Sequence, residues 1–399
     1  SLLLSLLIYG YATGVFSSRR IERATYDSVA FRFIAAGAHP DHDTLATFRR
    51  RFLGELADLF VQVLEVAQEM KLVTLGTISL DGTKIHANAS RHSALSYGHI
   101  EKMEAQLQSE VQELLALAEQ ADQSNVPDGV SLPEEIQRRE DRLKAMAEAK
   151  AKIEARAKAR FKREQAEYQA KLAAREEKQK KTGRKPGGRP PKPPTAGPKA
   201  KDQLNLTDEE SRIMPVADGG FEQAYNAQAA VDAHSMLVIA PAVTQACNDK
   251  EQVKPMLAQL AALPESLGKA DTLLADTGYF SATNVAACEK AGIDPHIAVK
   301  RERHHQPPLE RFTEPGPLAD TSTPVQRMVH KLQTRAGRNA YALRKQTVEP
   351  VFGIIKSVLG FRQFSLRGLD KVSGEWALVC LAWNLKRMAV LRPKSAQWA

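Results

Sequence analysis

The chain contains few cysteines and no long apolar segment. Its three cysteines, Cys247, Cys288 and Cys380, lie far apart among 399 residues and form no C-x-x-C pair. Neither a disulfide framework nor a cysteine zinc site is supported, and free thiols in a cytosolic protein are expected. The apolar start, residues 1–16, is too short to span a membrane and lacks the basic region and cleavage site of a signal peptide. We expect a buried helix there.

Acidic residues are fewer than basic ones. The chain has 56 Lys and Arg against 47 Asp and Glu, which gives a formal net charge of +9. This balance favours a polyanionic partner. The composition is otherwise that of a soluble globular protein, with 43% hydrophobic and 26% charged residues, and the length allows two or three domains.

One stretch has no acidic residue at all. Residues 180–201 hold eight Lys or Arg together with many Pro and Gly, so residues 181–202 are predicted to form a flexible, extended basic linker. The fragment GGRPPK resembles tracts that place an Arg in a narrow A·T minor groove. We expect mainly sequence-independent phosphate contacts; a disordered linker is the alternative. The candidate DNA-binding residues are Arg184, Lys185, Arg189 and Lys192.

Residues 1–72 are predicted to be helical, because apolar residues recur there at spacings of three and four. Pro40 and Asp41 interrupt the pattern, and Asp43 or Thr44 is expected to cap the helix that follows. A small DNA-binding domain and a merely solvated helix face explain the basic residues of this region equally well. These residues are Arg19, Arg20, Arg49, Arg50 and Arg51.

Two long helices are predicted within residues 98–180. A loop at 124–133 separates them, and Ser131 with Glu134 forms a capping-box pattern at the start of the second. We expect an antiparallel coiled-coil hairpin that acts as a spacer or a dimerisation arm. Its seam is predicted to consist of Ile100, Met103, Leu107, Leu114 and Leu117 in the first helix and of Ile136, Leu143, Met146, Ile153 and Phe161 in the second.

The remaining segments predict an α/β domain. Residues 73–97 contain a β-branched strand, and residues 203–392 contain a β-hairpin, then alternating helices and strands, then mostly helix from about residue 325. The helical hairpin and the basic linker interrupt this domain after its first strand. Residues 393–399 form a tail.

Three acidic residues far apart in the chain have settings that suit metal ligands. Asp81 in SLDGTK and Asp276 in LLADTGYF each end an apolar strand before a glycine turn, and Glu349 in TVEPVFG lies in a helical segment. Hard divalent cations bind a few carboxylates, with water and substrate phosphate completing the shell. Two strand-end aspartates and one helical glutamate are therefore a candidate for a two-metal phosphodiester site.

Each acid taken alone has a simpler explanation. An aspartate before glycine is more often a turn former than a ligand, and a helical glutamate is usually solvated. Asp232 also ends a strand, but it falls at the hairpin, where Asp is common. Tyr279, Trp376 and Trp383 are expected to pack in the core. What favours a metal site is that the three acids occur together, on a strand, a second strand and a helix in that chain order.

Several segments resemble the DDE transposases of bacterial insertion sequences. They are LDGTKIHANAS, NLTDEESRIM, AYNAQAAVDAHSMLV, LLADTGYF and TVEPVFGIIKSVLGFRQFSLRGLDKVSGEWALVCLAWNLKRM. The chain looks like the branch that has an RNase H-like catalytic domain and a Tyr–Arg–Glu–Lys signature. The resemblance implies an RNase H-like mixed sheet with an N-terminal helical domain, and it implies that Asp81, Asp276 and Glu349 are both the catalytic acids and the metal ligands.

The signature departs from the family spacing at one interval. Lys356 follows Glu349 at the family distance, and Tyr341 precedes Arg344 correctly, but four residues instead of three separate Arg344 from Glu349. Lys345 occupies the position at the family interval. The two lie about 100° apart on a helix, so only one can face DNA. Lys356, Arg344 and Lys345 are the DNA-binding candidates of this segment, with Arg362 and Arg367 as further backbone contacts.

The resemblance implies cleavage of DNA at the ends of an insertion sequence and joining of those ends to target DNA. It also implies two Mg²⁺ or Mn²⁺ ions, double-stranded DNA as substrate, a homodimer on paired ends, and a bacterial cytoplasmic location at the nucleoid. The alternatives are a metal-dependent nuclease without strand transfer, a DNA-binding protein that has lost catalysis, and a coiled-coil scaffold.

Overall fold

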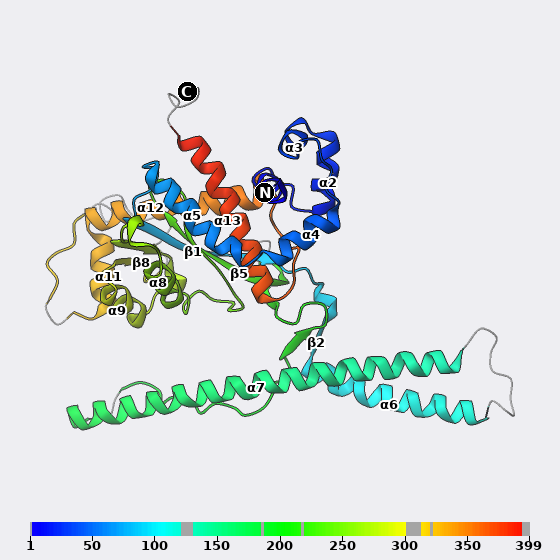
Figure 1. Cartoon of the computed structure of the whole chain (residues 1–399). Coiled ribbons are helices and arrows are strands. Elements are labelled where there is room, and N and C mark those ends of the chain that lie inside the picture. Colours follow the sequence, from blue (N-terminus) through cyan, green and yellow to red (C-terminus); the bar gives the residue numbers. More distant parts are fainter. Residues whose placement is uncertain are drawn as a thin grey trace. The chain divides into compact units, whose positions relative to one another are not determined.

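A computed structural model of the chain describes residues 2–120, 131–184, 187–216, 219–300, 313–319 and 322–392. The chain divides into two compact units (Figure 1). The first spans residues 1–89 and 210–399, and the second spans residues 90–209. No helix of the described residues is long and apolar enough to cross a membrane.

The first unit combines helices with a mixed sheet. Its helices are α1 Leu2–Ala12, α2 Ser18–Asp27, α3 Val29–Ile34, α4 His42–Arg51, α5 Glu55–Glu69, α8 Val253–Ala261, α9 Ala282–Lys290, α11 Pro324–Gln333, α12 Arg335–Gly353 and α13 Leu369–Leu391. Its strands are β1 Thr77–His86, β4 Arg212–Pro215, β5 Phe221–Asp232, β6 Val238–Thr244, β7 Thr272–Ala275 and β8 Asp294–Ile297.

The sheet has the strand order β4-β5-β1-β7-β8, with β6 paired to β5 along another part of its length. β1 pairs antiparallel with β5 and parallel with β7, and β7 pairs parallel with β8. With β1, β5, β6, β7 and β8 numbered one to five, the order is 3-2-1-4-5. This mixed α/β arrangement fits the RNase H-like core that was predicted.

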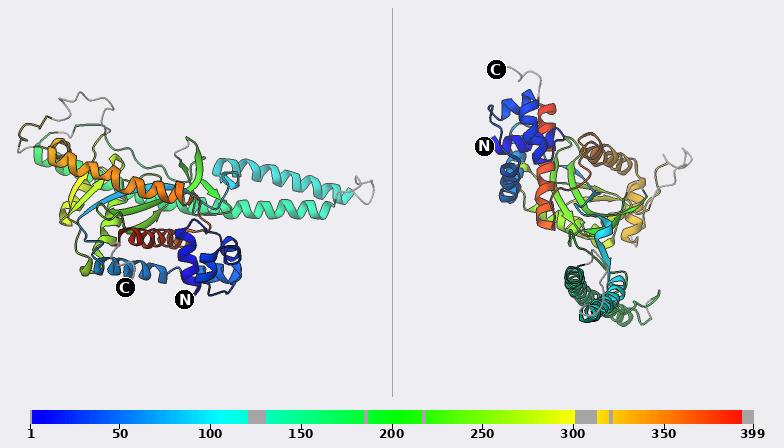
Figure 2. Two further views of the ribbon diagram at one scale, coloured as in Figure 1. Left: turned by 90° about the horizontal axis from the view of Figure 1, so that it is seen from above. Right: turned by 90° about the vertical axis from the view of Figure 1, so that its right-hand side faces the viewer.

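Side-chain alternation along the strands separates two apolar layers. Ile85, Ala227 and Ala229 face a core that contains residues of α5, α12 and α13. Leu80 and Ala230 face the other way, into a core with residues of α8 and α9. Figure 2 shows helices on both sides of the sheet. Asp81 shares a face with Ile85 and is therefore directed toward α12.

The predicted strands and helices of the α/β domain are confirmed. The hairpin turns where it was expected, with Asp232 accepting hydrogen bonds from the backbone and hydroxyl of Ser235, and Ser281 caps α9. The predicted cap of α4 is wrong: Asp41 holds that position and accepts from the Asp43 N–H. The short strand β4, at an edge of the sheet, was not predicted.

Arg49 is not on the predicted basic face. Its side chain is buried, and its Nη1 donates to the Tyr11 hydroxyl at 2.9 Å. That hydroxyl donates to Oε1 of the fully buried Glu375 of α13 at 3.2 Å. The same carboxylate accepts from the backbone N–H groups of Ser365 and Leu366. Burial raises the pKa of Glu375, and the Arg49 guanidinium partly offsets the rise.

The second unit contains two helices that pack side by side, α6 Tyr97–Gln120 and α7 Leu132–Thr182, and two strands, β2 Ala94–Ser96 and β3 Gln203–Asn205. Its core contains Ile100, Leu107, Met146, Ala149, Ile153 and Leu204. Pairs of Lys150 with Glu104 at 2.7 Å and Arg139 with Glu110 at 2.8 Å link the helices in antiparallel order.

Two details of the predicted helices are wrong. Leu117 is 53% exposed and does not belong to the apolar seam. Ser131 caps α7 without the side-chain hydrogen bond of a capping box. Most of the predicted loop, residues 124–130, lies outside the described residues.

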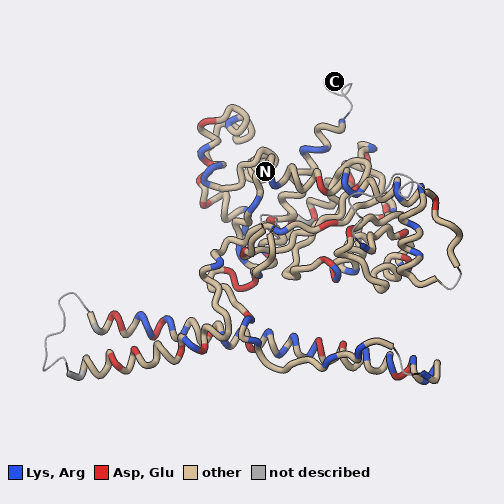
Figure 3. Tube along the Cα trace, turned by 180° about the vertical axis from the view of Figure 1, so that it is seen from behind, with Lys and Arg blue, Asp and Glu red and all other residues tan. Residues whose placement is uncertain are grey.

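The basic linker lies along the C-terminal half of α7. Arg175 donates to the Gly188 carbonyl at 3.3 Å and Arg160 to the Gly197 carbonyl at 3.2 Å. Arg160 also forms two 2.9 Å bonds with the Asp202 carboxylate. Figure 3 shows Lys and Arg along both segments. The first two residues of the linker, Lys181 and Thr182, are the end of α7. The rest of the linker has no regular secondary structure where it is described, but it is held to the helix rather than free.

We expect Glu375→Ala to destabilise the first unit by about 3–5 kcal/mol, because it leaves the Arg49 charge and two backbone donors without a buried acceptor. Glu265→Ala, at an exposed position of the same unit, should change stability by less than about 0.5 kcal/mol. Urea denaturation measures both. Equal midpoints for the two variants would contradict the structural role of the buried network.

Candidate active site

The pairing of β1 with β7 places two of the predicted acids side by side. Leu80 and Ala275 are partners in the parallel ladder, so Asp81 and Asp276 are the next residues of adjacent strands. β7 ends at Ala275, whereas β1 continues to His86. Among the described residues, no strand pairs with β1 on the β7 side between Asp81 and His86, where a single bridge joins His86 to Gln363.

Each aspartate is oriented by a hydrogen bond from a nearby backbone N–H. The predicted glycine turn after Asp81 is wrong, because β1 continues through Gly82 to His86. Oδ1 of Asp81 accepts from the Gly82 N–H at 2.8 Å. Oδ1 of Asp276 accepts from the Gly278 N–H at 2.8 Å and so caps the short 3-10 turn Thr277–Tyr279. The bond of Asp276 is local turn chemistry, as the simpler explanation of that aspartate supposed, whereas Asp81 lies within a strand. The two bonds hold both carboxylates at the end of the β1–β7 pair.

Helix α12 brings the third acid to the same face. Arg344 donates through Nη1 to Oδ2 of Asp81 at 3.1 Å and through Nη2 to Oε1 of Glu349 at 2.8 Å. One guanidinium thus joins the two carboxylates. Arg344 is buried, whereas Lys345 is exposed. The helix ends in a π-helical turn, Ile354–Val358, from which Lys356 donates to the Thr83 hydroxyl at 3.2 Å.

Thr83 shares a face of β1 with Asp81, because it lies two residues further along the strand. Asp81, Asp276, Glu349 and Lys356 therefore gather around one stretch of β1.

The acidic cluster lacks sufficient neutralising charge. Burial raises the pKa of Asp81 from 3.8 to about 6, and the nearby Asp276 and Asp249 carboxylates add to the rise while the Gly82 N–H and Arg344 oppose it. Oxygen donors of this kind are those that Mg²⁺ and Mn²⁺ prefer. A guanidinium already bridges two of the acids, so these residues fit a cation.

The acids are more widely spaced than a single-ion site requires. Among the described residues, one set of three has ligand atoms all within 4.8 Å of one another, and it is Glu22, Asp41 and His42 at the start of α4. There His42 Nδ1 lies 2.8 Å from Glu22 and 2.9 Å from Asp41. The predicted acids do not form such a set. A two-metal site, with ions about 3.5–4 Å apart, needs a wider spacing.

A fourth acid at the site was not predicted. Oδ1 of Asp249, between β6 and α8, accepts from Asn226 Nδ2 at 2.6 Å and from Gln228 Nε2 at 2.7 Å. Lys84 Nζ lies 3.7 Å from the same oxygen. The sequence signal that could have revealed it lies in β5, where Asn226 and Gln228 stand two residues apart in a largely apolar strand. Polar side chains on one face of such a strand indicate a buried polar partner.

The remaining candidates lie elsewhere. Arg184, Arg189 and Lys192 are exposed on the linker of the second unit, and Lys185 lies outside the described residues. Asp232, the competing acid, accepts hydrogen bonds from Ser235 of its own hairpin. Tyr279, Trp376 and Trp383 are buried as predicted.

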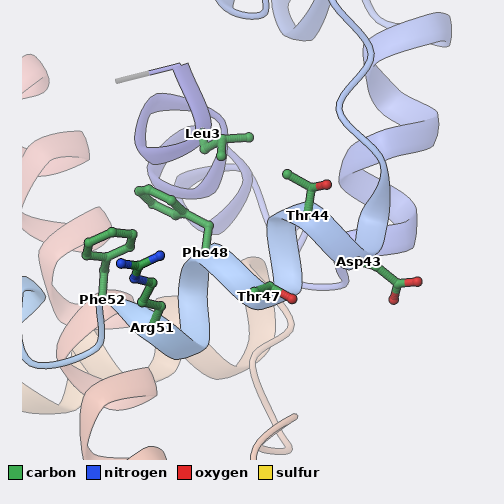
Figure 4. Close-up of a pocket in the computed structure, with 7 residues that line it drawn as sticks. All are labelled: Leu3, Asp43, Thr44, Thr47, Phe48, Arg51 and Phe52. Carbon is green, nitrogen blue, oxygen red and sulfur yellow. The ribbon is translucent and has the colours of Figure 1, made fainter.

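A shallow pocket of about 410 Å³ in the N-terminal helices contains none of the candidate acids. It lies between α1 and α4, and Arg51 stands beside the Phe52 ring, 5.4 Å from its centre (Figure 4). Its lining is Leu3, Asp43, Thr44, Thr47, Phe48, Arg51 and Phe52.

Two known families match the chain. The family described as "Transposase DDE domain" matches residues 197–385, which include Asp276 and Glu349. The family described as "Transposase domain (DUF772)" matches residues 1–51, which contain α1 to α4. The chain therefore belongs to the DDE transposases of insertion sequences, whose members generally use divalent metal ions. Asp81 lies between the two matches. Neither a search of curated proteins nor a search of solved structures gave a match.

The raised pKa of Asp81 predicts how stability depends on pH. The folded state holds this proton up to about pH 6 and the unfolded state only to about 3.8, so stability falls as pH rises through that window. The loss is about 3 kcal/mol at 1.36 kcal/mol per pKa unit. We expect Asp81→Asn to remove this fall. Urea denaturation from pH 4 to 7 measures it, and parallel pH profiles for parent and variant would refute it.

Proposed function

We propose that the chain cleaves DNA at the ends of its insertion sequence and joins those ends to target DNA. The observation that carries the proposal is the convergence of Asp81, Asp276 and Glu349, from two strands and a helix, around one half-buried stretch of β1. The family membership also supports it, and Asp81, which neither match includes, is assigned from the geometry alone.

We assign Asp81, Asp276 and Glu349 as the residues that hold two Mg²⁺ or Mn²⁺ ions. Bound ions of this kind lower the pKa of a nucleophilic water or hydroxyl and stabilise the leaving oxygen. The side chains supply position: the backbone N–H groups of Gly82 and Gly278 orient the aspartates, and α12 carries the glutamate. No protein nucleophile and no histidine base is required, since water or a 3′-hydroxyl attacks the phosphorus.

The basic residues of α12 and its π-helical turn divide into two roles. Arg344 is directed inward by two carboxylates and serves to hold Asp81 and Glu349 together. Lys345 is exposed one residue further on and is the better candidate for a phosphate contact. Lys356, beside Thr83, is placed to contact a phosphate near the scissile bond as a point charge.

We assign further DNA contacts to two regions outside the acids. Residues 1–72 form the N-terminal DNA-binding domain, with Arg19, Arg20, Arg50 and Arg51 as its basic face. The linker at 181–202 contacts phosphates through Arg184, Lys185, Arg189 and Lys192. Residues 98–180 form an antiparallel coiled-coil arm that supports a homodimer on paired ends. The catalytic domain comprises 73–97 and 203–392.

Replacing Asp81, Asp276 or Glu349 singly by Ala should abolish metal-dependent cleavage and leave DNA binding nearly unchanged, because each removes a ligand and no phosphate contact. The assay uses DNA that carries the ends of the element, with Mn²⁺ present or absent. Asp271→Ala, an exposed acid at the start of β7, is the matched control. An active variant would remove its residue from the site.

An assay for the joining of DNA ends to target DNA distinguishes the proposed function from its alternatives. A product in which element ends are covalently linked to target DNA supports a transposase, whereas cleavage without joining supports a nuclease. Binding without either reaction in the parent chain would support a protein that has lost catalysis.

Changing Arg184, Arg189 and Lys192 to Gln should flatten the dependence of log affinity on log salt by about 3, at 0.9 per phosphate contact. Fluorescence anisotropy with labelled duplex DNA over a range of salt concentrations measures the slope. The matched control changes three exposed lysines of the first unit, Lys254, Lys269 and Lys290. A slope equal to that of the parent would show that the linker does not contact phosphates.

A further inference from the structure

Asp249 lies against both segments that carry the candidate aspartates, strand β1 and the 3-10 turn after β7. A β-carbon placed on Gly82 would lie 2.8 Å from Oδ1 of Asp249 and 2.1 Å from Nε2 of Gln228. A β-carbon placed on Gly278 would lie 3.6 Å from Oδ2 of Asp249 and 3.0 Å from Oδ1 of Asp276. The two carboxylate oxygens of Asp249 therefore stand beside the glycines that follow Asp81 and Asp276.

The contacts at Gly82 explain why glycine follows Asp81. Gly82 pairs with Gln228 across the sheet, so both positions point to the face opposite α12. The space where a side chain of residue 82 would extend is filled by Asn226, Gln228 and Asp249. Any side chain there would have to displace this polar group or move β1.

A set of hydrogen bonds joins the turn after Asp276 to the side chains that pack against Gly82 of β1. The Tyr279 hydroxyl, in the turn after Asp276, donates to Oε1 of Gln228. Gln228 donates to Asp249 and to Asn226, and Asn226 donates to Asp249 and to the Ala246 carbonyl. Tyr279, Asn226 and Gln228 are fully or almost fully buried. Buried polar groups that are satisfied in this way fix one arrangement of their segments.

The two oxygens of Asp249 are used differently. Oδ1 receives both amide donors and lies 3.7 Å from Lys84 Nζ. Oδ2 accepts no hydrogen bond from the part of the chain that the structure describes, and it is directed toward the turn of Asp276. Asp249 is thus anchored on the β1–β5 side and reaches the β7 side.

We propose that Asp249 is a positioning residue that fixes the separation of Asp81 and Asp276. It would do so by bridging, from the opposite face of the sheet, the glycines that follow them, Gly82 in β1 and Gly278 in the turn after β7. The inference rests on the proposed function, because it is the metal-binding geometry of these two aspartates that Asp249 would set. Its action requires an acceptor at Oδ1 rather than direct contact with the substrate.

The test measures Mn²⁺ affinity by isothermal titration calorimetry without DNA, at a temperature where circular dichroism shows every variant folded. Asp249→Ala should weaken Mn²⁺ binding by about 10–100-fold, as loss of an outer-shell partner does. Asp249→Asn keeps the Oδ1 acceptor and should lose less than about tenfold. Tyr279→Phe removes one hydrogen bond and should lose about fivefold, and it serves if Asp249→Ala does not fold. Asp271→Ala is the matched control and should bind as the parent does.

A purely structural residue would lower the melting temperature without changing affinity in the folded state. Unchanged Mn²⁺ affinity in Asp249→Ala, or in Tyr279→Phe if Asp249→Ala does not fold, would overturn the positioning role and leave the proposed function intact. An Asn variant as weak as the Ala variant would also overturn it, because charge rather than the acceptor would then matter. Absence of Mn²⁺ binding in the parent chain would instead overturn the proposed function and this inference together.

Discussion

The parallel pairing of β1 with β7 is the constraint on which the rest of the site depends. It brings two aspartates to adjacent positions where the pairing ends, and their negative charges oppose each other there at short range. Such an arrangement costs free energy in the folded protein. The sheet, the N–H groups of the two glycines and the Arg344 guanidinium hold the carboxylates together against that repulsion, which is how a protein prepares a site for a cation.

Two sides of the sheet contribute to this arrangement. On one side, α12 supplies Glu349, Arg344 and, through its π-helical turn, Lys356. On the other, Asp249 and the amides of β5 fill the space that the glycines leave. The candidate acids thus lie between α12 on one side and a buried polar network on the other.

The strands and the candidate acids were predictable because their signals are local. Apolar runs followed by Asp marked β1 and β7, although β1 continues past Asp81 to His86, and chain order then indicated which acids would meet. The direction of Arg344, the burial of Arg49 and the place of Asp249 were not predictable. Each depends on a partner more than 20 residues away, at Asp81, Tyr11 and Asn226. The docking of the linker on α7 depends likewise on single arginines, such as Arg160, that composition does not distinguish.

The most direct test of the central claim is anomalous diffraction from crystals of the chain soaked in Mn²⁺. The account predicts anomalous density between the carboxylates of Asp81, Asp276 and Glu349, with the Arg344 side chain displaced from at least one of them. Density confined to Glu22, Asp41 and His42, or none near β1 in a crystal that binds Mn²⁺ elsewhere, would contradict it.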